Sequence, residues 1–147
     1  MKIVTDKKIL RIKSELVSKD ENIDELVAKL KQANSETKNG CGVASVQIGI
    51  HKRIAWLEVD GQEIVLVNPE ILKKSEKLIV EIESCLSIPV LKIPVRRFES
   101  IQVKINSFTG EVKIFSGFIA RVIQHEIDHF NGILITDKRF KKKKKHK

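Results

Sequence analysis

Five consecutive residues of this chain have the types and spacing of a metal-binding and acid–base site. The sequence His125-Glu126-Ile127-Asp128-His129 is an H-E-x-x-H pattern. Four residues of α-helix advance about 6 Å and rotate by roughly 400°, so both imidazoles leave one helix face and can hold one cation. Glu126 lies roughly 100° around the helix, where its carboxylate can reach a water on that cation without binding the cation. The pattern predicts hydrolytic metal chemistry, and the alternative is a helix whose histidines only cover a core face.

A third metal ligand must come from elsewhere, because catalytic metal sites commonly have three protein ligands and one open position. Thermolysin-like enzymes use a downstream glutamate, but the only acid after His129 is Asp137. Metzincins use a third histidine further along the motif, and that position is Ile135 here. The ligand is therefore expected upstream, where Cys85 is the best candidate, since thiolate and imidazole suit Zn²⁺ or Fe²⁺. The alternative, that Cys85 is an inert core residue, remains open at this point.

Helices and strands that could position these residues can be predicted from the apolar pattern. Apolar residues repeat at helical spacing over 118–130, and Gly132 is placed to end that helix. An earlier amphipathic helix is predicted over 20–31, followed by a polar loop at 34–39. Asp60-Gly61 and Thr109-Gly110 are turn signals between alternating runs. Strands are predicted at 55–59, 64–67, 78–82, 101–105 and 112–115. Two helices around a mostly antiparallel β middle indicate an α+β fold.

The positive charge of the chain is concentrated at its C-terminal end. There are 28 Lys+Arg against 19 Asp+Glu among 147 residues, which gives a formal net charge of +9. Eight of the basic residues lie in 138–147, so residues 1–137 carry a net charge of only +1. We therefore expect one catalytic domain over 1–137 and a disordered lysine-rich tail over 138–147. The tail is expected to be a solubilising end, or else to attract RNA weakly, including that of the ribosome.

Other function classes are disfavoured by composition. No apolar stretch is long enough to span a bilayer, and the first ten residues lack the apolar core of a secretion signal. Two cysteines cannot make a disulfide framework, so a reducing compartment is expected. We predict a cytoplasmic monomer without a membrane contact, with an organelle or the cytoplasm of a virus-infected host as alternatives.

Three segments of the chain, residues 40–47, 83–87 and 124–129, resemble sequence boxes of peptide deformylases of bacterial type. Residues 83–87 (E-S-C-L-S) resemble the E-G-C-L-S box, and residues 40–47 (G-C-G-V-A-S-V-Q) resemble the G-x-G-φ-A-A-x-Q box. Residues 124–129 (Q-H-E-I-D-H) match the Q-H-E-x-D-H box. The resemblance implies an α+β fold in which antiparallel sheets pack around a central H-E-x-x-H helix, with a helix near the N-terminus.

The resemblance also implies a reaction. It assigns Cys85, His125 and His129 to one divalent metal ion, usually Fe²⁺ in this family, with Zn²⁺, Ni²⁺ or Co²⁺ as substitutes. Glu126 would take a proton from the metal-bound water and pass it to the leaving amine. The expected reaction is hydrolysis of the N-formyl group from methionine at the start of nascent chains, which releases formate.

Further residues receive roles from the same boxes. Gln47 and the backbone N–H of Leu86 would stabilise the oxyanion, which is worth roughly 3–4 kcal/mol of transition-state stabilisation. The backbone at Gly42 and Val43 would pair with the peptide. Helical spacing, rather than a box, places Val122 and Phe118 one and two turns before His125, where they would wall an apolar side-chain pocket, although ordinary core positions are at least as good an interpretation.

The chain departs from the family pattern at three places. Ser45 replaces the second alanine of the first box, and Ser84 replaces the glycine of the second. Both substitutions are expected to add a side chain close to the site. Bacterial members commonly continue into a further helix after the metal helix, whereas this chain is C-terminally short and ends in lysines.

Three other functions fit the sequence less well. The glycines and serine of residues 40–45 nearly match a dinucleotide fingerprint, but no strand precedes them. An H-E-x-x-H endopeptidase is disfavoured by the missing downstream ligand. An RNA-binding protein with a structural metal is disfavoured by Glu126, because such a site needs no acid or base.

Overall fold

The structure is a computed structural model that describes residues 2–142 and combines helices with β-strands. Its helices and 3₁₀ turns (η) are α1 (Lys7–Leu10), α2 (Ile23–Ser35), η1 (Ser45–Ile48), α3 (Phe118–Phe130) and η2 (Ile135–Lys138). Its strands are β1 (Gly42–Ala44), β2 (Ile54–Val59), β3 (Gln62–Val67), β4 (Glu70–Lys74), β5 (Leu78–Cys85), β6 (Ile88–Phe98), β7 (Ser100–Asn106) and β8 (Glu111–Ser116). The predicted α+β class is confirmed.

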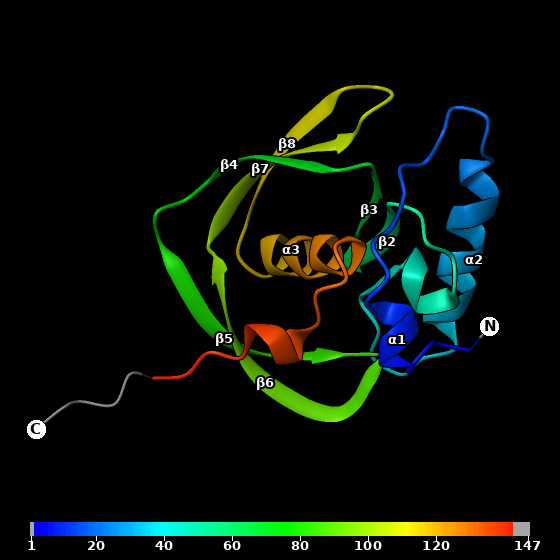
Figure 1. Ribbon diagram of the computed structural model, residues 1–147. Helices are drawn as coiled ribbons and strands as arrows, with labels where there is room; N and C mark the ends of the chain where they lie inside the picture. Colours follow the sequence, from blue (N-terminus) through cyan, green and yellow to red (C-terminus); the bar gives the residue numbers. More distant parts are fainter. Residues whose placement is uncertain (1, 143–147) are drawn as a thin grey trace, which may run out of the picture.

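The strands form two sheets that frame α3 (Figure 1). The larger sheet has the order β1-β2-β3-β7-β4, with β8 also paired to β7, and the smaller sheet is the β5–β6 hairpin. The prediction of antiparallel sheets is wrong for one pair, because β3 and β7 run parallel where Val67 lies opposite Asn106. Parallel neighbours need a long connection, and the chain between these two strands provides it. The larger sheet is therefore mixed.

Both predicted hairpins are present. In the β2–β3 hairpin Val59 lies opposite Gln62, and the two turn residues Asp60 and Gly61 have φ of 51° and 78°. Two successive positive φ angles are typical of the type I′ turn, which matches the twist of the flanking strands. The β7–β8 hairpin turns at Gly110, as the Thr109-Gly110 pair predicted.

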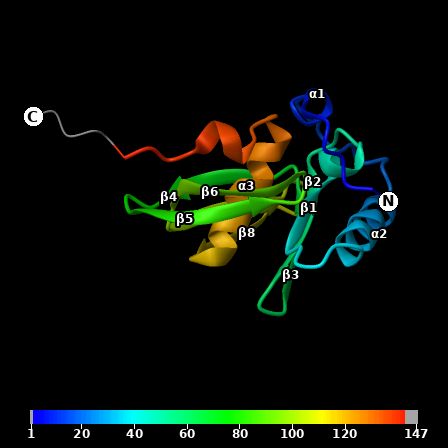
Figure 2. The same ribbon diagram turned by 90° about the horizontal axis from the view of Figure 1, so that it is seen from below.

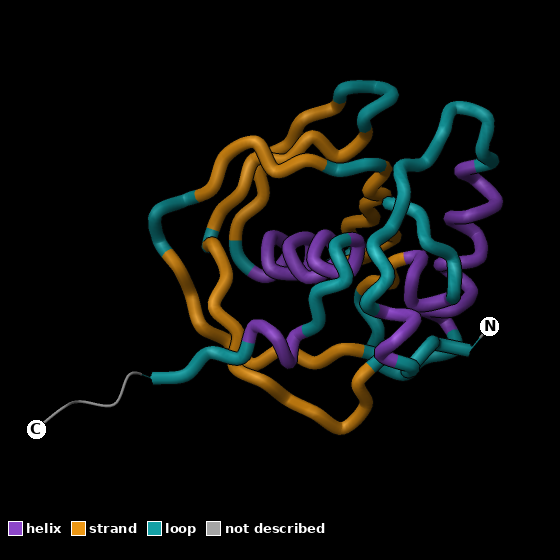
Figure 3. Tube along the Cα trace, viewed as in Figure 1, coloured by secondary structure: helices purple, strands orange, loops and turns teal. Residues whose placement is uncertain are grey.

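The predicted metal helix is α3, and it lies inside the frame of strands (Figure 3). Ala120, Ile123 and Phe130 are fully buried, and α3 contacts β1, β2, β6 and β8. Gly132 ends the helix with φ of 70°, and a Cβ there would lie 2.4 Å from the carbonyl oxygen of Arg11. Glycine is therefore required at this position by both backbone conformation and space.

The larger sheet is covered by different helices on its two faces near β1. Figure 2 shows α2 on one side of β1 and β2 and α3 on the other. Alternate residues follow this division: Val43 and Trp56 pack in the cluster that contains α2, whereas Ala44 and Leu57 pack in the cluster that contains α3. The two-residue period of a strand thus decides which side chains face the metal helix.

Some elements were not predicted from the pattern. The helix predicted over 20–31 continues to Ser35, so the expected loop at 34–39 begins later. β1, β4 and β6 were missed, and β6 contains Pro89 and Pro94, which argue against a strand in sequence. The prolines are tolerated because β6 pairs with β5 on one side, so their missing N–H groups need not break a central ladder.

The first residues of the segment predicted as a tail lie against β6. Lys138 ends η2, Arg139 forms an isolated β-bridge with Val95, and the N–H of Phe140 donates to the carbonyl of Pro94 at 2.7 Å. Residues 143–147 lie outside the described residues, where disorder stays a prediction, as does the domain boundary at 137. Within residues 2–142 no helix has the length and apolarity needed to cross a membrane.

Candidate metal centre

Three side chains from two distant parts of the sequence converge on one point. Cys85 ends β5, and His125 and His129 lie on successive turns of α3. The Nε2 atoms of the two histidines are 3.2 Å apart, and Cys85 Sγ lies 3.5 Å from His129 Nε2. All three ligand atoms lie within 4.8 Å of one another. The sequence-based expectation that these residues meet is therefore fulfilled in space.

The three atoms fit a divalent metal ion. For a tetrahedral ion with the usual metal–nitrogen and metal–sulfur distances, ligand atoms are separated by about 3.3–3.6 Å.

Burial lowers the pKa of His125, but hydrogen bonds with Cys85 and Glu83 outweigh it and raise that pKa to about 10. Burial, and then the charge on His125, lower the pKa of His129 far below its usual value. The surroundings thus favour a single positive charge at this point, together with one neutral imidazole.

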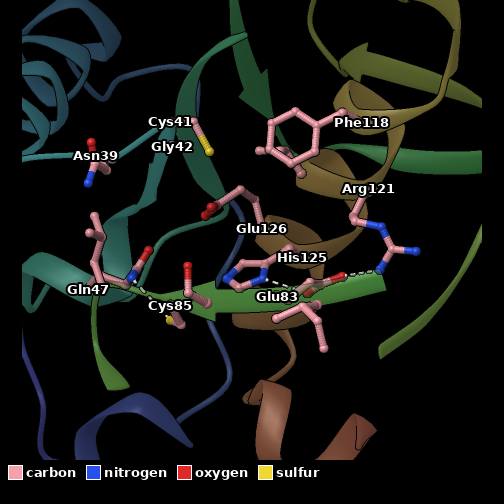
Figure 4. A pocket seen from close by; sticks show the side chains of 15 residues that line it. Asn39, Cys41, Gly42, Gln47, Glu83, Cys85, Phe118, Arg121, His125 and Glu126 are labelled. Carbon is pink, nitrogen blue, oxygen red and sulfur yellow. Dashed lines mark hydrogen bonds and ion pairs between the residues drawn. The ribbon is translucent and has the colours of Figure 1, made fainter. Parts of the chain in front are cut away.

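Glu83 holds His125 in the orientation that a metal ligand needs. Its Oε1 lies 3.1 Å from His125 Nδ1, so Nδ1–H donates to the carboxylate and Nε2 is the ring nitrogen directed at the metal site (Figure 4). Two buried arginines bind the same carboxylate: Arg97 through two contacts of 2.9 Å and Arg121 through one of 2.6 Å. Arg97 also contacts Asp128, which joins β6 to α3.

This carboxylate should make the stability of the metal-free protein sensitive to acid. Burial alone would raise the pKa of Glu83, but hydrogen bonds from His125 and Arg97 outweigh it and lower the pKa from 4.5 to about 2. Because the folded-state pKa is the lower one, the contribution is present above the unfolded-state value and is lost as pH falls toward 2. It amounts to about 3 kcal/mol.

Urea unfolding of metal-free protein between neutral pH and pH 3 measures this contribution. Glu83→Gln should lower the free energy of unfolding at neutral pH and flatten its decline in acid, because the buried arginines lose their counter-charge. A variant as stable as the wild type at neutral pH, with the same acid dependence, would contradict the role given to Glu83.

Glu126 is placed for acid–base chemistry rather than for metal binding. Its side chain is buried, and its Oε2 atom has no hydrogen-bond partner among the described residues. Burial raises its pKa to about 7. A buried carboxylate with a pKa near neutrality and an unused oxygen can take up and release a proton.

Gly42 leaves the space that the Glu126 carboxylate occupies. A Cβ at position 42 would lie 3.2 Å from Glu126 Oε1 and 3.1 Å from Leu57 Cβ, closer than most Cβ contacts. We expect Gly42→Ala to displace the carboxylate and lower kcat/KM about 10-fold, because small misplacements of a reacting group are costly. Steady-state kinetics and metal analysis of the same preparation test this. An unchanged kcat/KM would show that the missing side chain at position 42 is not needed for Glu126 to act. A loss of bound metal would show that the substitution disturbs the metal ligands as well.

Gln47 has a fixed orientation in the same site. Its Oε1 accepts a hydrogen bond of 2.9 Å from the N–H of Ala44, so Nε2 must be the donor. Nε2 donates to Ser87 Oγ at 3.1 Å. It also lies 3.8 Å from Cys85 Sγ (Figure 4). Leu86, the other expected oxyanion residue, follows Cys85 in the chain and lines the same pocket.

One pocket opens onto the metal ligands and contains most of the predicted residues. Gly42 and Val122 line it, together with residues to which the sequence assigned no role, among them Cys41, Ile82 and Arg121. Phe118 also lines this pocket, as expected from its place two helical turns before His125. The lining residues come from the segment around β1, from the end of β5 and from α3: Asn39, Gly40, Cys41, Gly42, Gln47, Ile82, Glu83, Ser84, Cys85, Leu86, Phe118, Arg121, Val122, His125 and Glu126.

Two residues of the first box have side chains that lie outside this pocket. The Val43 side chain is fully buried toward α2, so it does not line the pocket. Ser45 is also fully buried, and its hydroxyl donates to the carbonyl of Lys52. Ser84 does line the pocket, as expected for its place in the second box. Of the two serine substitutions, only Ser84 therefore adds a side chain to the wall.

A thiol and two imidazoles around one point, next to a carboxylate with one oxygen unpaired among the described residues, define a metallohydrolase. The family profile described as Polypeptide deformylase matches residues 1–145. The chain belongs to this family.

Several relatives agree with this assignment. A peptide deformylase of Dictyoglomus thermophilum is 40% identical over 135 residues, which are 88% of this chain and 86% of the relative. The crystal structure of the peptide deformylase from Thermotoga maritima superposes with a TM-score of 0.86 at 33% identity, covering 96% of this chain and 97% of that one. A Met-Ala-Ser-bound class I type b peptide deformylase from Acinetobacter baumannii superposes with a TM-score of 0.83 at 32% identity, covering 94% and 97%.

Proposed function

We propose that this protein hydrolyses the N-formyl group from methionine at the start of nascent polypeptides and releases formate. The observation that carries the proposal is the Glu126 carboxylate, whose Oε2 has no hydrogen-bond partner among residues 2–142, in a pocket that Cys85 and His125 also line. Family membership and the Met-Ala-Ser complex of the relative support the same substrate class.

The chain's own residues supply the proton transfers and the stabilisation of charge. A divalent ion held by Cys85, His125 and His129 would supply Lewis-acid chemistry and lower the pKa of a bound water. Glu126 takes a proton from the attacking water and passes it to the amine nitrogen as the formyl C–N bond breaks. Gln47 Nε2–H and the Leu86 N–H donate to the formyl oxygen as it gains negative charge. The products are formate and a free N-terminus.

The edge strand of the larger sheet offers a binding site for the peptide backbone. β1 is the terminal strand of its sheet, so an extended peptide could add to it by backbone hydrogen bonds. Gly42 and Val43 would then contribute through their backbone, which suits a Val43 side chain turned toward α2. The methionine side chain would enter the apolar part of the pocket beside Val122 and Phe118.

The metal and the cellular setting are part of the proposal. One thiolate and two imidazoles suit Fe²⁺ or Zn²⁺, and we propose Fe²⁺ in the cell, with Zn²⁺, Ni²⁺ or Co²⁺ as substitutes. We propose a monomer that acts in the cytoplasm, where nascent chains begin with formyl-methionine.

Formyl-Met-Ala-Ser and casein together separate the proposed reaction from the alternatives. Metal-loaded protein should release formate and a new amine in equal amounts from the peptide and leave casein intact. Casein cleavage without formate would favour an endopeptidase. Neither reaction, with metal still bound, would favour a structural metal site.

The C-terminal residues are proposed to give a weak, salt-sensitive association with RNA, such as that of the ribosome. A second pocket, between β6 and the C-terminal segment, is lined by five basic residues and two phenylalanines, with Leu78 beside them: Arg96, Phe98, Lys138, Arg139, Phe140, Lys141 and Lys142. The Arg96 guanidinium lies 5.7 Å from the centre of the Phe140 ring. Basic side chains next to aromatic rings suit a single-stranded backbone and its bases.

Removing these charges should weaken RNA binding without changing turnover. Log affinity falls with log salt concentration. In the triple variant Arg96→Ala/Lys141→Ala/Lys142→Ala this decline should be less steep, by about 0.7 for each phosphate that the protein no longer neutralises. Fluorescence anisotropy with a labelled oligouridine measures the slope, and Lys29→Ala/Lys31→Ala on α2 is the control. If the two variants bind the oligouridine equally weakly, this surface has no special role.

A further inference from the structure

Ser87 is a buried polar residue that lies behind the pocket. It occupies the turn between β5 and β6, two residues after Cys85, and is 2% exposed. It does not line the pocket, so it would not touch the substrate. Its hydroxyl oxygen lies 3.1 Å from Gln47 Nε2, and this side-chain contact joins the β5–β6 turn to η1, forty residues earlier in sequence.

The Gln47 amide is held from both of its ends. On one side Oε1 accepts from the N–H of Ala44 at 2.9 Å, and on the other Nε2–H donates to Ser87 Oγ. A primary amide has two N–H groups on Nε2. Because Ser87 takes one of them, the other is directed toward Cys85 Sγ, 3.8 Å away, and the pocket.

Without the Ser87 hydroxyl, one of these two constraints disappears. The terminal torsion of a glutamine is broad, so a single hydrogen bond to Oε1 leaves the amide free to rock about it. A buried N–H without an acceptor would also draw the amide toward another partner, because such a group is costly to leave unsatisfied. In either case the second N–H would no longer point steadily at the sulfur and the pocket.

We propose that Ser87 is a positioning residue, which fixes the Gln47 amide so that one N–H faces the Cys85 sulfur and the formyl oxygen. The kinetic part of this inference rests on the proposed deformylation. The part that concerns the sulfur does not, because the contact of Gln47 with Cys85 is independent of any substrate.

Two measurements on Co²⁺-loaded protein test the proposal. A hydrogen bond stabilises thiolate electrons, so Ser87→Ala should move the thiolate-to-cobalt absorption band to longer wavelength, in the same direction as is expected for Gln47→Ala. The same substitution should lower kcat about 10- to 100-fold, the usual effect of losing a residue that orients a metal-site group, with little change in KM.

The double variant Ser87→Ala/Gln47→Ala separates a positioning role from a general structural one. Because Ser87 acts through Gln47, the double variant should be no slower than Gln47→Ala alone. Losses that multiply, or a Ser87→Ala absorption band at the wild-type wavelength, or a Ser87→Ala kcat equal to that of the wild type, would each overturn the proposal. If Ser87→Ala does not fold, Ser87→Cys keeps the volume with a weaker acceptor, and the same criteria apply.

Failure of this inference can be told apart from failure of the proposed function. A wild-type protein that binds Co²⁺ but releases no formate would reject deformylation. The absorption band of Ser87→Ala would then still decide whether Ser87 positions Gln47. An unshifted band would reject the positioning role even in an active enzyme.

Discussion

Glu126→Gln is expected to lower kcat for formyl-Met-Ala-Ser by about 10²–10⁴-fold while metal content and fold remain as in the wild type. The amide has nearly the same size but cannot accept the proton of the attacking water, and general acid–base catalysis contributes a factor of this order. Glu126 Oε2 has no partner among the described residues, so the substitution should break no hydrogen bond made by that atom.

The comparison needs a matched substitution and two structural readouts. Glu58→Gln makes the same chemical change at an exposed position on β2, and it should leave kcat unchanged. The amount of bound metal per chain and the temperature of thermal unfolding should be the same for the wild type, Glu126→Gln and Glu58→Gln. If Glu126→Gln keeps wild-type turnover, the proton is carried by another group, and the mechanism is wrong.

Cys85→Ala is expected to lower metal affinity by more than about 100-fold and to abolish formate release at ordinary metal concentrations. Residues that only orient metal ligands already contribute 10- to 100-fold to affinity, so the loss of a ligand should exceed that range. The remaining imidazoles of His125 and His129 could hold the ion only weakly.

The second cysteine is a control for metal binding. Cys41 lines the same pocket, but its sulfur does not join the Cys85–His125–His129 group, so Cys41→Ala should retain bound metal. Competition with a chelator, followed by metal analysis, gives the affinity of each variant. Equal affinities for Cys85→Ala and the wild type would show that Cys85 is not a ligand.

Some parts of the site could be predicted from sequence because they depend on local geometry. The spacing of His125 and His129 places both imidazoles on one helix face, and Asp60-Gly61 specifies its own turn. Cys85 could be proposed from its chemistry and from the second box, although only the fold shows that β5 ends next to α3.

Other parts depend on tertiary contacts that no short pattern contains. Glu83 binds Arg97 and Arg121, which lie 14 and 38 residues further along the chain. The sequence gives only a weak indication that Glu83 belongs to the site: an acid two residues before a ligand on a strand points to the same side as the ligand. The same alternation explains why Val43 could act only through its backbone, since its side chain faces α2 whereas its neighbour Gly42 lines the pocket.

One metal ion at Cys85, His125 and His129 is expected to support removal of the formyl group. Protein purified without oxygen should be assayed for formate release from formyl-Met-Ala-Ser, with iron, zinc, nickel and cobalt measured on the same sample. We predict formate and amine in equal amounts, at a rate that rises in proportion to bound metal up to one ion per chain. Metal-replete protein that releases no formate would contradict the proposed metal-dependent removal of the formyl group.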